Sequence, residues 1–212
     1  MDDDSESECM MCREPETATR CRAMERVLDG LSVPCAFRQN GCTAMIRYAG
    51  KKAHAASCDY ASCYCPIAGC AGDYVGATLR EHVALDHAAV RHGRVTPGCL
   101  TALKMRAGET AQVVRLFNAG RTTAEFLLVV GRGVPSGRAL SVIHIGGGAP
   151  DKQEKFKYRI EVVGEAGVLS LSGQAKGVER LTKEYEASAF LFVPDAIWDA
   201  APEEVPVFIE LK

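Results

Sequence analysis

The chain has 212 residues, of which 47% are hydrophobic and 25% are charged, and its formal net charge at pH 7 is −2. This composition is typical of a globular protein with room for one medium domain and a smaller one, and no apolar run approaches the roughly 18 residues of a membrane helix. The small net charge argues against a protein built mainly around a nucleic-acid backbone.

The first eight residues are acidic and lack the basic and apolar regions of a secretory signal. Nine of the ten cysteines lie before residue 71. Without a secretory signal we expect a reducing compartment, the cytoplasm or nucleus, where Cys/His clusters bind metal more often than they form disulfides. Cys9 and Cys12 form a lone CxxC pair and Cys21 could be at most a third ligand, so we predict no stable metal there.

A short helix is predicted from Arg20 to Leu31, because apolar residues recur on one face and Asp29-Gly30 provides an end signal. We expect this helix to pack against the segment that follows it. Next come a predicted short strand from Met45 to Tyr48 and a helical turn from Lys51 to Ser57.

Two sets of Cys and His residues follow with nearly the same spacing. The gaps are six, eleven and three residues in the first set and four, eleven and four in the second. Each set has a Cys pair on a short turn, a spacer of about one helix, and then two ligands on one helical face, which is the layout that tetrahedral zinc needs. We therefore predict two structural zinc ions, the first held by Cys35, Cys42, His54 and Cys58 and the second by Cys65, Cys70, His82 and His87.

Three further residues near these patterns have less specific interpretations. Cys63 breaks the repeat and is predicted to be a spare thiol. A helix is predicted from Thr78 to His92, with His92 as a solvent-facing residue near its C-terminal end. His144 is predicted to be a strand residue, since no other Cys or His lies near it in sequence.

After residue 93 the sequence predicts short strands separated by Gly, Pro, Asp and Asn. The segment 125–130, EFLLVV, is continuously apolar after Glu125 and is predicted to be a central strand, whereas 155–163 alternates between apolar and charged residues. These patterns predict an antiparallel β-sandwich. The expected strands are 100–105, 111–117, 125–130, 139–145, 155–163, 167–173, 189–193 and 205–211.

The double Cys/His spacing, the phrase RCRAMERVLDGLSVPC and the CPIAGC turn resemble the seven-in-absentia (SINA/SIAH) ubiquitin ligases in their plant SINA-like form. The resemblance implies a RING domain, two zinc fingers and a TRAF-like β-sandwich that binds protein substrates and dimerises. The expected fold is therefore α+β, with a tail and RING remnant at 1–19, a connecting helix at 20–34, a double zinc finger at 35–92 and a TRAF-like sandwich at 93–212.

A RING has eight ligands that hold two zinc ions and recruit the ubiquitin-charged E2 enzyme. By the resemblance, Cys9 and Cys12 correspond to the last ligand pair of such a domain. We therefore expect this chain to select substrates, to dimerise with itself or a relative, and to need a RING supplied by a partner for ubiquitin transfer; E2 binding by this chain alone is not expected.

Two other functions are compatible with parts of the sequence. The chain could be an adaptor or inhibitor that binds proteins through the edge of a sheet without ubiquitin transfer. It could also bind nucleic acid through the second finger, but the stretch ATLREHVALDHAAV there offers one arginine, Arg80, among Glu81, Asp86 and apolar residues. No catalytic motif is found in the predicted strands.

Overall fold

The computed structural model describes residues 21–70, 73–106, 108–131, 134–146, 155–164, 167–182, 187–200 and 203–212. The predicted acidic tail and RING remnant, with Cys9 and Cys12, lie outside these residues. The chain divides into two compact units, Met1–Cys58 and Asp59–Lys212. Among the described residues, no helix is both long enough and apolar enough to cross a membrane.

The described part of the first unit is a small hairpin between helices. Its elements are α1 (Arg22–Gly30), β1 (Ser32–Pro34), the 3₁₀ turn η1 (Arg38–Asn40), β2 (Met45–Arg47), the 3₁₀ turn η2 (Tyr48–Gly50) and α2 (Lys51–Ser57). β1 pairs antiparallel with β2, with Val33 opposite Ile46. The N–H of Tyr48 donates to the carbonyl of Leu31 over 2.9 Å, which joins the end of α1 to the hairpin.

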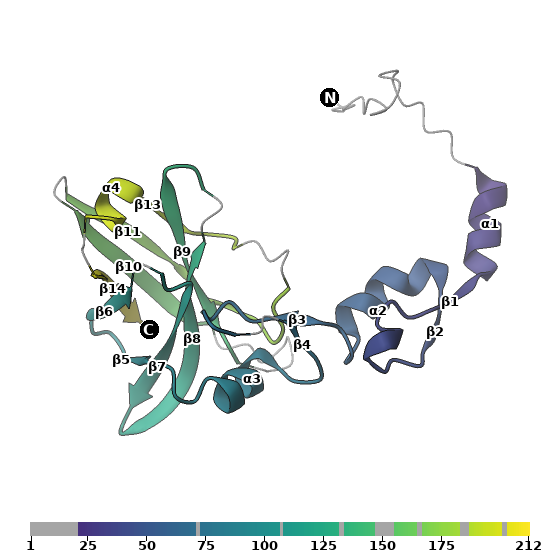
Figure 1. The fold of residues 1–212 in the computed structure, drawn as a ribbon, viewed down its shortest axis with the longest axis horizontal. Helices are drawn as coiled ribbons and strands as arrows, with labels where there is room; N and C mark the ends of the chain where they lie inside the picture. The colour runs from purple at the N-terminus through teal and green to yellow at the C-terminus, as the bar shows by residue number, and fades with distance from the viewer. Residues whose placement is uncertain are drawn as a thin grey trace, which may run out of the picture. The chain divides into compact units, whose positions relative to one another are not determined.

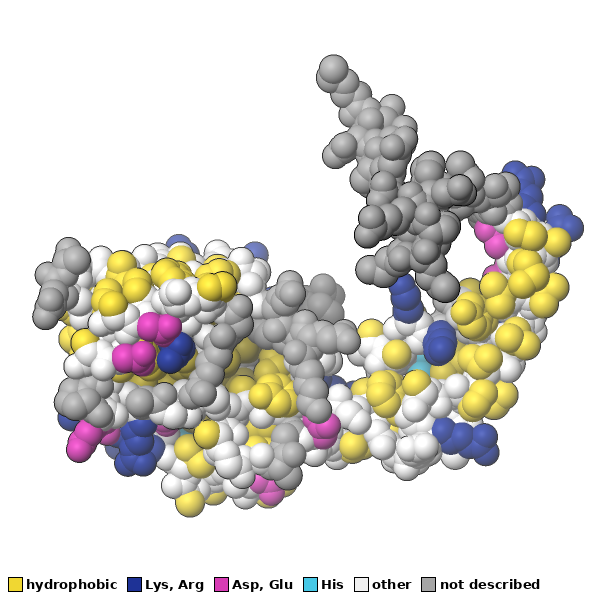
Figure 2. Space-filling view, turned by 45° about the horizontal axis from the view of Figure 1, so that its top comes forward, with side chains coloured by type: hydrophobic (Ala, Val, Ile, Leu, Met, Phe, Trp, Pro, Cys, Tyr) yellow, Lys and Arg dark blue, Asp and Glu magenta, His cyan; other side chains and the backbone are white. Residues whose placement is uncertain are grey.

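The predicted packing of α1 against the segment that follows it is only slight among the described residues: α1 contacts η2 and Leu28 is half-buried. The helix lies where the sequence placed it, but none of its residues is buried. Met24, Val27 and Leu31 of its apolar face are 59%, 66% and 45% exposed. Figure 2 shows hydrophobic side chains gathered along this unit. Among the described residues, the two three-residue strands β1 and β2 are too short to cover this face.

The second unit begins with a small finger and continues into two sheets (Figure 1). The finger has the hairpin β3 (Cys63–Tyr64) and β4 (Asp73–Tyr74) and the helix α3 (Leu79–Asp86). The sheets are formed by β5 (His92–Val95), β6 (Thr101–Arg106), β7 (Ala111–Asn118), β8 (Arg121–Gly131), β9 (Gly137–His144), β10 (Lys157–Gly164), β11 (Gly167–Gln174), β12 (Lys176–Gly177), β13 (Leu191–Pro194) and β14 (Glu204–Leu211), with the short helix α4 (Asp195–Trp198) before β14.

Most strand pairs are antiparallel, and the fold is α+β as predicted. One sheet has four strands in the order β11-β10-β14-β6, and the other has six, β12-β9-β8-β7-β5 with β13 also paired to β9. Strands are present in all eight expected regions. The sequence did not predict β5 and β12, which make the two parallel pairs, β5 with β7 and β12 with β9.

The main core lies between the two sheets. Phe126 and Leu128 of β8 pack there with Ile160 of β10 and Ile209 of β14, and Trp198 of α4 joins the same cluster. The alternation predicted for β10 is confirmed, since Tyr158, Ile160 and Val162 are buried and contribute to this core. This arrangement is consistent with a TRAF-like sandwich.

The opposite face of the six-stranded sheet is covered by the finger. Leu79 and Val83 of α3 share a second apolar cluster with Val113 of β7, Leu127 of β8 and Ile143 of β9. The apolar run at 126–130 is therefore continuous because β8 is central and both of its faces are buried. The predicted domain boundary at 92/93 stays a prediction, but the second finger and the sheet share one core.

Candidate zinc centres

The first centre is formed by four residues from successive elements of the first unit. Cys35 follows β1, Cys42 follows η1, His54 lies in α2 and Cys58 caps the C-terminal end of that helix. The turn between the two cysteines depends on Gly41, whose φ of 111° favours glycine. The four candidate ligand atoms all lie within 4.8 Å of one another.

The distances in the first centre fit one tetrahedral zinc ion. The Sγ atom of Cys35 lies 3.8 Å from Sγ of Cys58 and 3.2 Å from Nε2 of His54, and Sγ of Cys42 lies 3.6 Å from the same nitrogen. Zinc bonds of about 2.3 Å to sulfur and 2.0–2.1 Å to nitrogen place tetrahedral ligand atoms about 3.5–3.8 Å apart. Three sulfurs and one imidazole nitrogen are donors that zinc prefers.

Backbone groups favour the thiolate form of these cysteines. The N–H of Phe37 donates to Sγ of Cys35 over 3.3 Å. Hydrogen bonding from the backbone of Ala44 lowers the pKa of the Cys42 thiol to about 7, with a smaller contribution from His54. Zinc binds the thiolate, so both interactions prepare the site for the ion.

The second centre is built by the finger of the second unit. Cys65 follows β3, Cys70 follows the turn at Gly69 (φ 84°), His82 lies in α3 and His87 caps its C-terminal end. Nε2 of His87 lies 3.4 Å from Sγ of Cys65, and Nε2 of His82 lies 3.4 Å from Sγ of Cys70. All four ligand atoms lie within 4.8 Å of one another, so this set also fits zinc.

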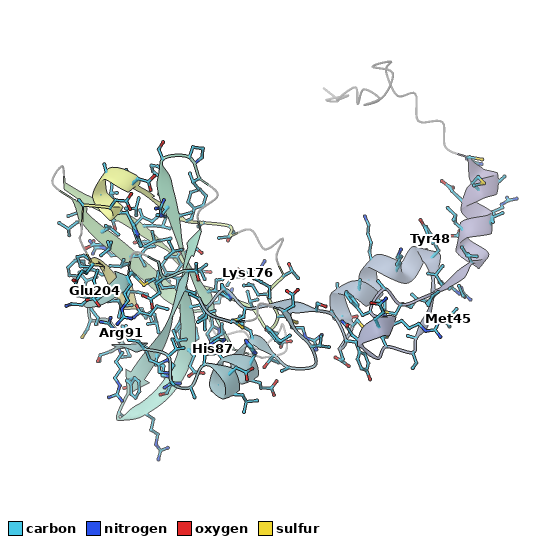
Figure 3. The ribbon with its side chains drawn as sticks, in the orientation of Figure 1. Met45, Tyr48, His87, Arg91, Lys176 and Glu204 are labelled. Atoms are coloured by element: carbon cyan, nitrogen blue, oxygen red, sulfur yellow. The ribbon has the colours of Figure 1, made fainter. Side chains whose placement is uncertain are left out.

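The second centre is set in an apolar environment. Burial raises the pKa of the Cys65 thiol to about 12 and lowers that of His87. A buried thiolate is costly without a neighbouring positive charge, and a zinc ion supplies that charge. Cys65 belongs to the cluster that α3 shares with the sheet, so this centre connects the finger hairpin to the sandwich (His87 is labelled in Figure 3).

The helix that carries the histidines ends earlier than predicted. It begins with a capping box in which Thr78 and Glu81 exchange hydrogen bonds of 3.2 and 2.8 Å. It ends at Asp86 because His87 leaves the helical conformation, with φ −121° and ψ 23°. His92 therefore begins β5 and does not end a helix, which corrects the sequence prediction. His144 lies in β9, as predicted.

Sequence reasoning missed two neighbours of the second centre. Nδ1 of His82 lies 2.7 Å from the carboxylate of Asp86, and the His82 ring stacks on Tyr74 with centroids 4.1 Å apart. A carboxylate on the outer nitrogen orients a metal-binding imidazole. The signal for Asp86 was available, because a residue four positions after a helical His lies on the same face.

The remaining described cysteines lie outside both sets. Cys63 is buried two residues before Cys65, but its Sγ donates to the carbonyl of Ala61 at 3.6 Å and the group of four excludes it. Cys21 and Cys99 are exposed. Each of the eight predicted ligands thus lies in the group of four residues to which the sequence assigned it.

Comparison with known proteins supports the zinc centres. Residues 26–97, which contain all eight residues, match the Sina zinc finger family. The chain is 29% identical over 197 residues to the putative E3 ubiquitin-protein ligase SINA-like 6 of Arabidopsis thaliana, covering 90% of this chain and 67% of that protein. It is 24% identical over 192 residues to E3 ubiquitin-protein ligase SINA-like 7 of the same plant, covering 90% and 66%.

A third relative matches a shorter part of the chain. The putative E3 ubiquitin-protein ligase SINA-like 9 of Arabidopsis thaliana is 36% identical over 83 residues, which are 38% of this chain and 29% of that protein. The chain spans about two thirds of the length of the first two relatives. The Sina zinc finger, the two Cys/His centres and the similarity to SINA-like proteins over 90% of the chain together support the seven-in-absentia (SINA/SIAH) family.

Proposed function

We propose that this chain binds protein substrates for ubiquitin transfer by a SINA-type ligase and so directs them to degradation. The observation that carries the proposal is the similarity over 90% of the chain to proteins named as E3 ubiquitin ligases. The zinc centres serve as structural elements in this proposal, because all four tetrahedral positions of each centre have a protein ligand and none is left for substrate.

The sandwich is the proposed substrate-binding part. The edge strands of the four-stranded sheet are β11 and β6. Those of the six-stranded sheet include β12 and β5. Such edges have backbone N–H and C=O groups that can pair with an extended peptide. We propose that protein substrates bind in this way, and that the chain pairs with itself or with a SINA-like relative.

Nucleic-acid binding by the second finger is less well supported. Arg80, the basic residue of α3, lies 3.2 Å from the carboxylate of Glu125 in β8. Leu79 and Val83 of the same helix pack against the sheet. A helix that reads bases must present several polar or basic side chains to a groove, and these residues are used within the protein.

A ubiquitin-chain assay tests the proposal. The purified 212-residue protein is mixed with E1, a panel of E2 enzymes and ubiquitin, with and without a SINA-type ligase that carries a complete RING. We expect no chains from the protein alone and an altered output when the complete ligase is present. The His82→Ala variant, which breaks the second centre, serves as a control that should lose this effect.

The possible outcomes separate the candidate functions. A raised output would indicate substrate delivery, and a lowered output would indicate the inhibitor alternative. Chains formed by the 212-residue protein alone would show that it recruits E2 itself and would contradict the need for a partner. An unchanged output in every mixture would contradict a role in ubiquitin transfer.

A further inference from the structure

The four-stranded sheet has a cavity of about 420 Å³ beside β10, β11 and β14. This volume lies within the range of about 300–1,000 Å³ that is usual for ligand sites. Its polar and charged lining residues are Lys157, Arg159, Ser172, Gln174, Glu210 and Lys212. None of them belongs to a zinc centre or to the finger.

The strand register places cations next to one another. Lys157 and Lys212 exchange two backbone hydrogen bonds of 2.8 and 2.9 Å, so they lie directly opposite each other on neighbouring strands. Arg159, two residues after Lys157, has Glu210 opposite it on one side and Ser172 on the other. Like charges directly opposite each other in a sheet are destabilising, and an anion bound between them would remove that cost.

The carboxylate side chains near the cavity are less exposed to solvent than the cations that they pair with. Glu210 pairs with Lys212 at 2.7 Å, but the Glu210 side chain is 14% exposed and that of Lys212 is 62% exposed. Glu161 pairs with Arg159 in the same way, with side-chain exposures of 11% and 51%. Lys157 is exposed and has no ion-pair partner among the described residues. The paired cations are therefore more exposed than their carboxylates, and Lys157 is the cation of the cavity that pairs with no described carboxylate.

We propose that this cavity binds an extended acidic peptide segment with carboxylates at alternate positions. Lys157 and Arg159 are two residues apart on one strand, so they point to the same side about 6.5–7 Å apart. An extended peptide repeats at the same interval, and each of its acidic side chains can meet one cation. The Ser172 hydroxyl and the Gln174 amide add uncharged donors.

A peptide fits this cavity better than a single-stranded nucleic acid does. Tyr158 is the aromatic residue of the lining and is only 4% exposed, so it presents no face on which a base could stack. The three cations of the cavity belong to a chain whose net charge is −2, which does not favour a nucleic-acid backbone. The cavity is lined partly by β11, one of the proposed substrate-binding edges, but the binding of an acidic peptide there does not require that the chain take part in ubiquitin transfer.

Fluorescence anisotropy with the zinc-loaded 212-residue protein tests the site. The probe is a labelled peptide of alternating Glu and Ser residues, compared with the same peptide carrying Gln in place of Glu. We expect the Glu peptide to bind at low salt and to weaken as salt is added, and the Gln peptide not to bind. Lys157→Ala should weaken binding about two- to five-fold, and Lys157→Glu by more.

Lys176→Ala is the matched control, because Lys176 is also an exposed strand lysine but lies in the other sheet (Figure 3). It should leave the affinity unchanged. Lys157 has no ion-pair partner among the described residues, so its removal leaves none of their carboxylates unpaired, and circular dichroism checks that the variants fold. The proposal would be overturned if the Lys157 and Lys176 variants lost the same affinity for the Glu peptide. It would also be overturned if the protein bound the Glu and Gln peptides equally, or bound neither. Tighter binding of an RNA oligonucleotide that depends on Lys157 would overturn it too.

Discussion

Nδ1 of His82 lies 2.7 Å from Oδ2 of Asp86, one helical turn further along α3. The contact fixes the ring so that Nε2 faces Cys70 at 3.4 Å. Stacking on Tyr74 holds the plane of the same ring. The second centre therefore depends on residues beyond its four ligands.

Replacement of Asp86 with Asn should lower the zinc affinity of the second centre about 10–100-fold, as is usual for the loss of an outer carboxylate. Competition with a chromophoric chelator measures this affinity. The first centre in the same molecule serves as the internal reference, and Leu85→Ala, at a residue 78% exposed on α3, is the control. Unchanged affinity would show that Asp86 does not position His82.

The core shared by α3 and the sheet predicts a large effect of Leu79. Leu79 is fully buried in the cluster that includes Val113 and Leu127. Leu79→Ala should lower the free energy of unfolding by about 2–5 kcal/mol, because it removes apolar contacts and leaves a cavity. Leu85→Ala should change it by less than about 0.5 kcal/mol. Urea unfolding of the zinc-loaded protein measures both, and similar values would contradict the shared core.

Loss of zinc should have different consequences in the two units. His54→Ala and His87→Ala should each release one zinc, because three ligands hold the ion poorly. Only His87→Ala should lower the unfolding midpoint of the sandwich, since the second centre lies in the cluster shared with the sheet. Metal analysis combined with urea unfolding tests this, and two zinc ions retained by either variant would refute its ligand assignment.

Glu204 of β14 should make stability depend on pH. Hydrogen bonding from Arg91, 2.8 Å away, holds the pKa of Glu204 below its usual value, and Lys104 at 3.4 Å adds to this (Figure 3 labels Arg91 and Glu204). A carboxyl whose folded pKa is lowered contributes stability above its unfolded pKa of about 4.3, and this is lost as the pH falls through the folded pKa.

The variant Glu204→Gln should therefore be less stable than the unmodified chain at pH 7, and the difference should shrink as the pH falls below about 4.3. Thermal unfolding at each pH, compared between the two proteins, removes the shared effect of acid on zinc binding. Glu203→Gln, at the exposed neighbouring residue, is the control and should show no such difference. A constant difference at every pH would exclude the ion pair as its cause.

The ligand sets could be predicted from sequence because zinc restricts both residue type and spacing. The strands could be predicted where apolar and polar residues alternate, as in β10. The short β5 could not, since its pairing with β7 depends on contacts with a strand distant in sequence. The sequence prediction extended α3 too far, because His87 leaves the helix to approach Cys65. Helix propensity depends on local sequence and does not include this contact.

The role of the second finger also required the structure. Because no predicted ligand lies beyond His87, the sequence predicts a sandwich that is independent of zinc. The structure places Leu79 and Val83 against β7 and β8, so we now expect chelation to weaken the sheet as well. The apolar run of β8 indicated two buried faces, but it could not show which element covers the second.

The central claim is that the chain holds two zinc ions, with five sulfur and three nitrogen ligands shared between them. Native mass spectrometry combined with zinc X-ray absorption on the purified protein tests it most directly. We predict two zinc ions per chain, with sulfur at about 2.3 Å and nitrogen at about 2.0–2.1 Å in that ratio. One ion per chain, or a sulfur share raised by Cys63 or Cys21, would contradict the assignment.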